Sequence, residues 1–328
     1  MSFVQHAFRS MHPLMQLVLL TCIVLTFMAI AAGAGMLWAS DGDVSHMQTL
    51  IHESQTGNLD RSTVLAMNNA NQILAFGLAS WIFAALVGRA FLGSFFMRRP
   101  APVMYVLAIG LALGMSPVLD WTFRLNEWAL VPGSSLHTWA GNLEAQAMTI
   151  TKSILDFSDT SSLLAVLFSV AVLPAICEEW LFRGTVQPIL VRATGNLHVG
   201  VWGAAILFSA IHMQFFGFLP RVLLGAAFGY LVASSSSLWP GIVGHFVNNA
   251  GVVLAAWWMG PEWIEQGLEP QPLQTWTGMD WALAAGALVI LFWCSRRLIQ
   301  VGDSRPYLSV LSSDLGPEAR KPAQTPQL

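Results

Sequence analysis

Charged residues are scarce in this chain, and their scarcity excludes most soluble folds. Asp, Glu, Lys and Arg make up 10% of the 328 residues, whereas hydrophobic residues make up 55%. A soluble domain typically carries about 25% charged residues. The composition is therefore that of a polytopic membrane protein. The formal net charge of −3 gives no reason to expect a nucleic-acid partner.

Cysteine is also rare, and two common hydrolase motifs are missing. The three cysteines, Cys22, Cys177 and Cys294, lie far apart in apolar runs without disulfide or metal-binding spacing. We expect all three to be packing residues. The sequence contains neither HExxH nor GxSxG, which excludes the corresponding zinc proteases and serine hydrolases. It also shows no internal repeat of the kind found in many transporters.

Long apolar runs account for most of the sequence. A membrane-spanning helix needs about 20 apolar residues. Candidate runs fall near 13–38, 71–96, 102–122, 162–182, 198–213, 221–233, 239–259 and 280–295. We therefore predict an all-α, polytopic membrane helix bundle with about eight transmembrane helices. The first run exceeds the roughly 7–15 residues of a signal-peptide core, so we expect an uncleaved anchor.

The runs and the polar segments between them predict an organisation along the chain. Residues 1–150 hold three membrane spans with polar loops, and 151–260 form a helical core with buried polar residues. An outer loop and the last span follow in 261–301, and 302–328, rich in Ser and Pro, are expected to be a disordered cytoplasmic tail. With eight spans, the segments on the same side of the membrane as the N-terminus contain most of the Lys and Arg residues. Because cytoplasmic segments are enriched in Lys and Arg, this distribution predicts that both termini are cytoplasmic. We expect a bacterial inner membrane as the location.

Charged residues interrupt one apolar run at PAICEEWLFRGT, residues 174–185. Glu179 and Arg183 are i,i+4 neighbours and can pair on a helix, so this pair could be purely structural. Glu178 points about 100° away around the helix and has no cationic partner nearby in the sequence. An ionisable residue within a membrane span is by default a functional-site candidate.

Two further polar clusters follow on later spans. His212 lies in FSAIH, and His245 precedes Asn248 and Asn249 in GHFVNNA, where His245 and Asn249 share one helix face. Taken alone, His212 is explained by a structural hydrogen bond between helices. A carboxylate, two histidines and an amide spread over three helices instead predict a common site.

The turn predicted near Gly195 supports that prediction. Glu178 and His212 are equally far from Gly195 along the sequence. In an antiparallel helical hairpin, residues equally distant from the turn lie at the same depth. We therefore expect Glu178 and His212 to lie level with each other.

The three clusters together resemble the CPBP family of intramembrane proteases, which includes the CAAX prenyl endopeptidases of the Rce1 type and bacterial Abi proteins. The family pattern is EExxxR, then FxxxH, then HxxxN, on membrane helices. Here the pattern is matched in order and spacing by Glu178-Glu179-Trp-Leu-Phe-Arg183, Phe208-Ser-Ala-Ile-His212 and His245-Phe-Val-Asn-Asn249. The resemblance covers roughly 160–258.

The resemblance implies a function and a role for each motif residue. The chain would be an intramembrane endopeptidase that hydrolyses a peptide bond of a membrane-associated protein or peptide within the lipid bilayer. Glu178 and His212 would activate water, and His245 and Asn249 would stabilise the oxyanion. The site-supporting residues would be Glu179, Arg183 and Phe208.

Two questions stay open at the level of the sequence. Glu178, His212 and His245 could ligate zinc, which favours three protein ligands plus water, but a metal-free mechanism that depends on the glutamate suits the same residues. The rival functions are a transporter that uses the buried charges for coupling, and a non-catalytic membrane scaffold or immunity protein. No other cofactor is expected.

Overall fold

The computed structural model of the chain describes residues 3–56, 59–87, 98–131, 133–155, 157, 159–260 and 276–313. Throughout these ranges the regular structure is helical, and no strand occurs in them. The prediction of an all-α membrane helix bundle is confirmed, and the chain is an integral membrane protein.

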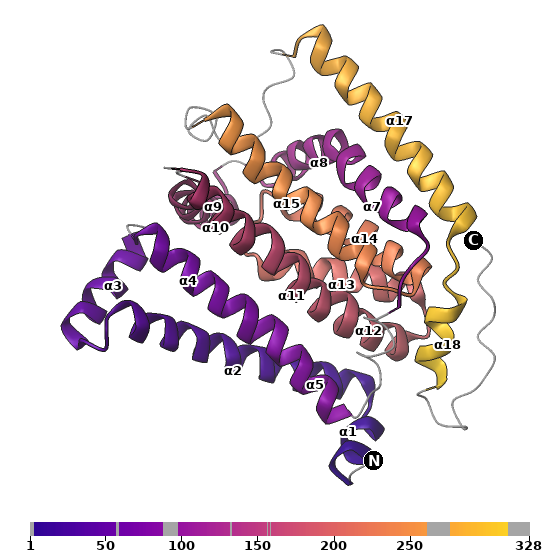
Figure 1. Ribbon diagram of the computed structural model, residues 1–328, viewed down its shortest axis with the longest axis horizontal. Helices are drawn as coiled ribbons and strands as arrows, with labels where there is room; N and C mark the ends of the chain where they lie inside the picture. The colour runs from indigo at the N-terminus through magenta and orange to yellow at the C-terminus, as the bar shows by residue number, and fades with distance from the viewer. Residues whose placement is uncertain are drawn as a thin grey trace.

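An N-terminal helical hairpin lies along one side of the bundle (Figure 1). Helix α1 (Phe3–Ser10) precedes α2 (Pro13–Ala39) and the short α3 (Val44–Thr56). The returning helix consists of α4 (Arg61–Asn71), the π-helical η1 (Gln72–Leu78) and α5 (Ala79–Val87), which pack antiparallel to α2. Apolar side chains of this hairpin, among them Leu20 and Phe76, share a buried cluster with Leu181 and Phe208 of the later helices.

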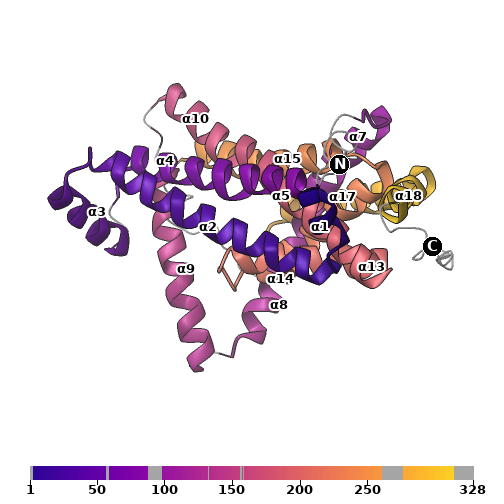
Figure 2. The same ribbon diagram turned by 90° about the horizontal axis from the view of Figure 1, so that it is seen from below.

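The middle of the chain begins with a helix packed in the bundle and then extends beyond it (Figure 2). Helices α7 (Pro102–Gly114) and α8 (Ser116–Ala129) are bent by 44° relative to each other. Helix α9 (Ser135–Ile154) follows, and Figure 2 shows α8 and α9 extending together beyond the other helices. Two polar segments predicted as loops therefore form helices, α3 and α9, and α9 continues across the predicted domain boundary at residue 150.

The core of the bundle begins with one long helix that contains two π-helical turns. Its parts are α10 (Thr160–Val166), η2 (Leu167–Val172), α11 (Leu173–Leu181), η3 (Phe182–Val186) and α12 (Gln187–Thr194). The chain then reverses at Gly195, whose φ of 67° suits glycine, and Asn196 caps the next helix. The predicted turn near Gly195 is confirmed.

The remaining helices complete the bundle. They are α13 (Leu197–Ile211), α14 (Phe218–Ser235), α15 (Trp239–Met259), α17 (Gly278–Val301) and α18 (Arg305–Ser313). In the described part of the chain, six helices are long and apolar enough to cross a membrane, or seven if the bent pair α7–α8 counts as one span. The predicted run at 198–213 corresponds to the shorter apolar helix α13.

Several helix ends gather at one end of the bundle. Ser237 Oγ donates a hydrogen bond to Arg98 O, and the backbone N–H of Asp303 donates to Ser234 O. Arg192 donates to Gln16 near the start of α2. The segments predicted to share the cytoplasmic side therefore lie together, and which side of the membrane they occupy stays a prediction.

The expectation of a disordered tail from residue 302 is wrong for residues 305–313. These residues form α18, in which Tyr307 and Leu311 are 0% and 2% exposed. The tyrosine and leucine are one helical turn apart, so a single face of α18 buries both against the core. The prediction of disorder was based on the average composition of the tail, which does not reveal a short helix with one apolar face. The expected outer loop at 261–275 and the end of the tail, 314–328, lie outside the described residues.

Candidate active site

The predicted pair Glu179–Arg183 is present and fully buried. Arg183 Nη1 lies 2.7 Å from Glu179 Oε1, and the two side chains are 1% and 0% exposed. Arg183 also donates from Nη2 to Gly225 O of α14 at 2.8 Å, and its Cζ lies 4.8 Å from the centroid of the Phe208 ring. The guanidinium therefore joins α11 and η3 to α13 and α14 while it neutralises Glu179.

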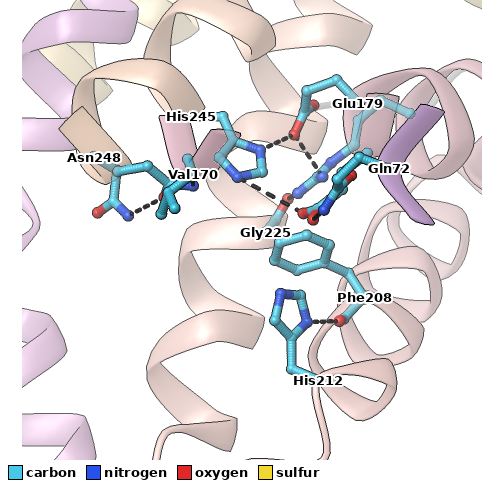
Figure 3. Close-up of polar contacts among 11 residues, drawn as sticks. Gln72, Val170, Glu179, Phe208, His212, Gly225, His245 and Asn248 are labelled. Carbon is cyan, nitrogen blue, oxygen red and sulfur yellow. Dashed lines mark hydrogen bonds and ion pairs between the residues drawn. The ribbon is translucent and has the colours of Figure 1, made fainter. Parts of the chain in front are cut away.

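His245 of α15 connects the two glutamates (Figure 3). Its Nδ1 lies 3.0 Å from Glu179 Oε1, and its Nε2 lies 3.8 Å from Glu178 Oε2. An ionised carboxylate only accepts hydrogen bonds, so Nδ1 carries a proton and Nε2 is the nitrogen that faces Glu178. The three side chains form a continuous polar chain from Arg183 through Glu179 to His245. The sequence alone did not indicate that Glu179 contacts His245.

Glu178 has a hydrogen-bond partner that the sequence interpretation missed. Its side chain is only 5% exposed, and Gln72 Nε2 donates to Glu178 Oε1 at 2.8 Å. The sequence shows no cationic partner near Glu178, and the partner in the structure is a neutral amide from a segment 106 residues earlier. The available signal was the run of amides Asn68-Asn69-Ala-Asn71-Gln72 at the start of an apolar span.

His212 lies at the C-terminal end of α13, beside Phe208. His212 Nδ1 lies 2.7 Å from Phe208 O, and a carbonyl oxygen only accepts, so Nδ1 carries a proton. When the ring is neutral, Nε2 is consequently free of a proton and can accept one. The next residue, Met213, adopts a φ of 55° and turns the chain out of the helix, which leaves His212 partly exposed.

Phe208 separates the two histidines. Its ring centroid lies 4.9 Å from that of His212 and 5.8 Å from that of His245. Figure 3 shows His212 on the side of Phe208 that faces away from the pair Glu179–His245. Among the described residues no hydrogen bond joins His212 to Glu178, so the two predicted water-activating groups meet in one cluster without direct contact.

Asn249 is held by the backbone of the long core helix. It lies one turn after His245 on α15, and its Nδ2 donates to Val170 O of η2 at 3.0 Å. Its Oδ1 accepts a hydrogen bond from Asn248 Nδ2 at 3.1 Å. These two contacts fix the orientation of the carboxamide, whose Nδ2 has a second N–H. In the described structure Asn249 makes no polar contact with the other predicted site residues.

The arrangement of these donors does not fit a zinc ion. A catalytic zinc needs three protein ligands around one point, and no three His, Cys, Asp or Glu side chains in the described ranges are arranged to hold a metal. The Phe208 ring stands between His212 and His245, two of the three predicted ligands. We therefore derive no step through a metal at Glu178, His212 and His245.

Comparison with known protein families finds a match over the segment that contains the candidate site residues. Residues 160–251 match the model of the family described as "Type II CAAX prenyl endopeptidase Rce1-like". The chain has no significant match among curated proteins or among solved structures. The matched segment is less than a third of the chain, and it contains the EExxxR, FxxxH and HxxxN motifs but not Gln72. The matched segment 160–251 carries all the residues predicted for the site, so over this segment the chain is similar to the Rce1-like family of type II CAAX prenyl endopeptidases.

Proposed function

We propose that the protein is an intramembrane endopeptidase that hydrolyses a peptide bond of a membrane-associated protein or peptide. The observation that carries the proposal is the environment of Glu178. This carboxylate lies inside a membrane-spanning helix of the Rce1-like segment, 5% exposed, between an amide donor and a histidine. A buried ionisable group with such partners in a membrane span is typical of a functional site.

Water activation falls to Glu178 and His212. Glu178 Oε1 is bonded to Gln72, so Oε2 is the oxygen that accepts a proton from water. His212 Nε2, the unprotonated nitrogen of its neutral ring, is the second acceptor at the partly exposed end of the cluster. The activated oxygen attacks the scissile carbonyl carbon and forms a tetrahedral intermediate. The C–N bond then breaks as the proton taken from water passes to the leaving amine.

Stabilisation of the oxyanion falls to α15. His245 Nε2, when it carries a proton, and the second N–H of Asn249 are donors one helical turn apart. Glu179 accepts from His245 Nδ1 and thereby fixes the rotation of the ring, and Arg183 in turn fixes Glu179. A buried carboxylate that orients a histidine in this way is a recurring feature of hydrolases.

The experiment is cleavage of internally quenched peptides by the purified protein in proteoliposomes. The peptides end in a CAAX sequence and are offered with and without a prenyl group on the cysteine. We expect Glu178→Gln and His212→Ala each to lower kcat/KM by at least about 100-fold, while Glu127→Gln, at an exposed position of α8, stays at the wild-type value. Wild-type turnover by Glu178→Gln would contradict the proposal.

The same preparation separates the rival functions and the metal question. A transporter would move solute across the liposome membrane without cleaving any peptide, and a scaffold or immunity protein would do neither. Metal analysis of the wild type beside Glu178→Ala tests the metal-free mechanism. We expect substoichiometric zinc in both, and one zinc per chain that is lost in Glu178→Ala would overturn it.

We also propose that both termini are cytoplasmic. In a variant without native cysteines, Arg305→Cys and Trp128→Cys carry thiols at strongly exposed positions of α18 and α8, which the distribution of Lys and Arg predicts to lie on opposite sides of the membrane. A membrane-impermeant thiol reagent added to intact cells should label only Trp128→Cys. Labelling of Arg305→Cys from outside would reverse the orientation.

A further inference from the structure

The N-terminal hairpin, which lies outside the Rce1-like segment, reaches the candidate catalytic carboxylate. Gln72 is the first residue of η1 and is 5% exposed. Its Nε2 lies 2.8 Å from Glu178 Oε1, and η1 packs directly on α11, the helix that carries Glu178. A residue from the first third of the chain is thus part of the immediate environment of Glu178.

The contact restricts how the carboxylate can turn. Glu178 Oε1 is bonded to Gln72, and Oε2 faces His245 Nε2 at 3.8 Å. The two oxygens are therefore directed to opposite partners, which come from different helices. An ionised carboxylate only accepts, so the amide must present Nε2 rather than Oε1 to it. The donor from Gln72 keeps Oε2 directed to the side where water and the peptide must react.

Within the described ranges, the hydrogen bond to Glu178 is the polar side-chain contact shown for Gln72. Its Oε1 is buried and has no hydrogen-bond partner among the described residues. A buried acceptor without a donor is costly. The hydrogen bond to Glu178 is therefore the interaction that keeps this amide at a buried position of a membrane span.

The backbone around Gln72 also brings the hairpin close to α11. Gly77 lies in η1, and a Cβ at this position would come within 3.3 Å of Cys177 Sγ, the neighbour of Glu178. Glycine at this position therefore allows a close approach of η1 to α11. The π-helical turn itself begins at Gln72, and π-helical turns within α-helices are frequent at functional sites.

We propose that Gln72 is a positioning residue for catalysis, which acts by holding the Glu178 carboxylate through its Nε2–H. The inference rests on the proposed function, because it assigns Glu178 the part of the group that activates water. It gives the N-terminal hairpin a role as one wall of the active site in addition to membrane anchoring.

The test compares Gln72→Met with a matched control on the same helix. Methionine has a similar length but no donor, so we expect kcat to fall about 10- to 100-fold with KM changed by less than about threefold. The control is Asn68→Leu. Asn68 lies one turn earlier and donates to a backbone carbonyl, Ser169 O, at 2.8 Å, so it tests the docking of the hairpin alone. We expect its kcat to stay within about threefold of wild type.

The outcomes distinguish this inference from the proposed function. If the wild type and Glu178→Gln cleave the peptide equally well, the proposed function is refuted. If Glu178→Gln is inactive but Gln72→Met has the wild-type kcat, the proposed role of Gln72 is refuted and the proposed function is not. An equal loss of kcat in Asn68→Leu and Gln72→Met would show that both act through docking, which also overturns the inference. Should Gln72→Met fail to fold, the shorter Gln72→Leu, which also lacks the donor, must show the same loss of kcat.

Discussion

Replacement of Arg183 by leucine tests the buried ion pair at the centre of the site. The change removes the cation beside Glu179, whose side chain is 0% exposed, and leaves a buried carboxylate with His245 as its remaining polar partner. Breaking a buried pair by removal of one partner costs about 3–5 kcal/mol. We therefore expect Arg183→Leu to lower the free energy of unfolding by that amount.

The double variant Glu179→Gln with Arg183→Leu removes both charges and should recover part of the loss. The uncompensated charge is gone, but two contacts of Arg183 stay lost. Its hydrogen bond to Gly225 O is of a charged type worth about 1.5–3 kcal/mol, and its contact with the Phe208 ring is worth about 0.5–2 kcal/mol. Leucine offsets part of this through apolar packing, so we expect the double variant to be about 1–3 kcal/mol more stable than Arg183→Leu.

Catalysis should not recover with stability. In the double variant the side-chain amide at position 179 can still accept from His245 Nδ1, but it is neutral and orients the ring less strongly. We expect kcat to stay at least about tenfold below wild type in both variants. If the double variant recovers both its free energy of unfolding and its kcat, Glu179 does not orient His245 as argued. If it recovers neither, Glu179 and Arg183 do not form the stabilising pair.

The assay is equilibrium unfolding in mixed detergent and dodecyl sulfate micelles, run beside the peptide-cleavage assay. Arg305→Leu is the matched control. Arg305 also pairs with a carboxylate, Asp303, but its side chain is 84% exposed. Surface ion pairs contribute little, so this variant should unfold at the wild-type denaturant concentration.

Two further predictions concern other parts of the fold. Gly241→Ala places a Cβ 2.8 Å from Glu179 Oε2 and should lower both the midpoint of thermal unfolding and kcat, whereas Gly251→Ala on the same helix meets nothing within 4 Å and should be neutral. The pKa of Asp60, which caps α4, is lowered to about 2, mainly by the Ser62 hydroxyl. Its stabilisation is therefore present above about pH 4 and is lost as the pH falls toward 2. Asp60→Ala should be less stable than wild type at pH 6, and the difference in unfolding midpoint should shrink by pH 2.

Local spacing predicted the parts of the site that depend on a single helix. The i,i+4 relation of Glu179 and Arg183 is enough to place them in contact, and the structure shows the pair. The glycine in Ala193-Thr194-Gly195-Asn196 predicted that the chain reverses between two helices, and Gly195 adopts the left-handed φ that this turn needs. Such features need only helical geometry and turn chemistry, both of which the sequence carries directly.

The contacts between helices could not be predicted in the same way. His245 and Glu179 are 66 residues apart, and Gln72 and Glu178 are 106 apart. Helical periodicity tells which residues share a face, but it does not tell which other helix covers that face. The partner of Glu178 is set by the packing of the N-terminal hairpin on α11, for which no motif exists in the sequence.

The π-helical turns explain both the limits of the sequence analysis and the construction of the site. An extra residue in a helical turn rotates everything beyond it by about 100°, so once η3 intervenes, counting residues back from Gly195 does not tell which face of the helix carries Glu178. The same turns lie where the site is assembled. Gln72 begins η1, and two successive carbonyls of η2, Ser169 O and Val170 O, accept amides from Asn68 and Asn249. Side-chain amides that satisfy the backbone at such turns keep an irregular helix stable within the membrane. Asn68 and Asn249 therefore satisfy the backbone of η2, whereas Gln72 is the amide in this group that contacts Glu178 itself.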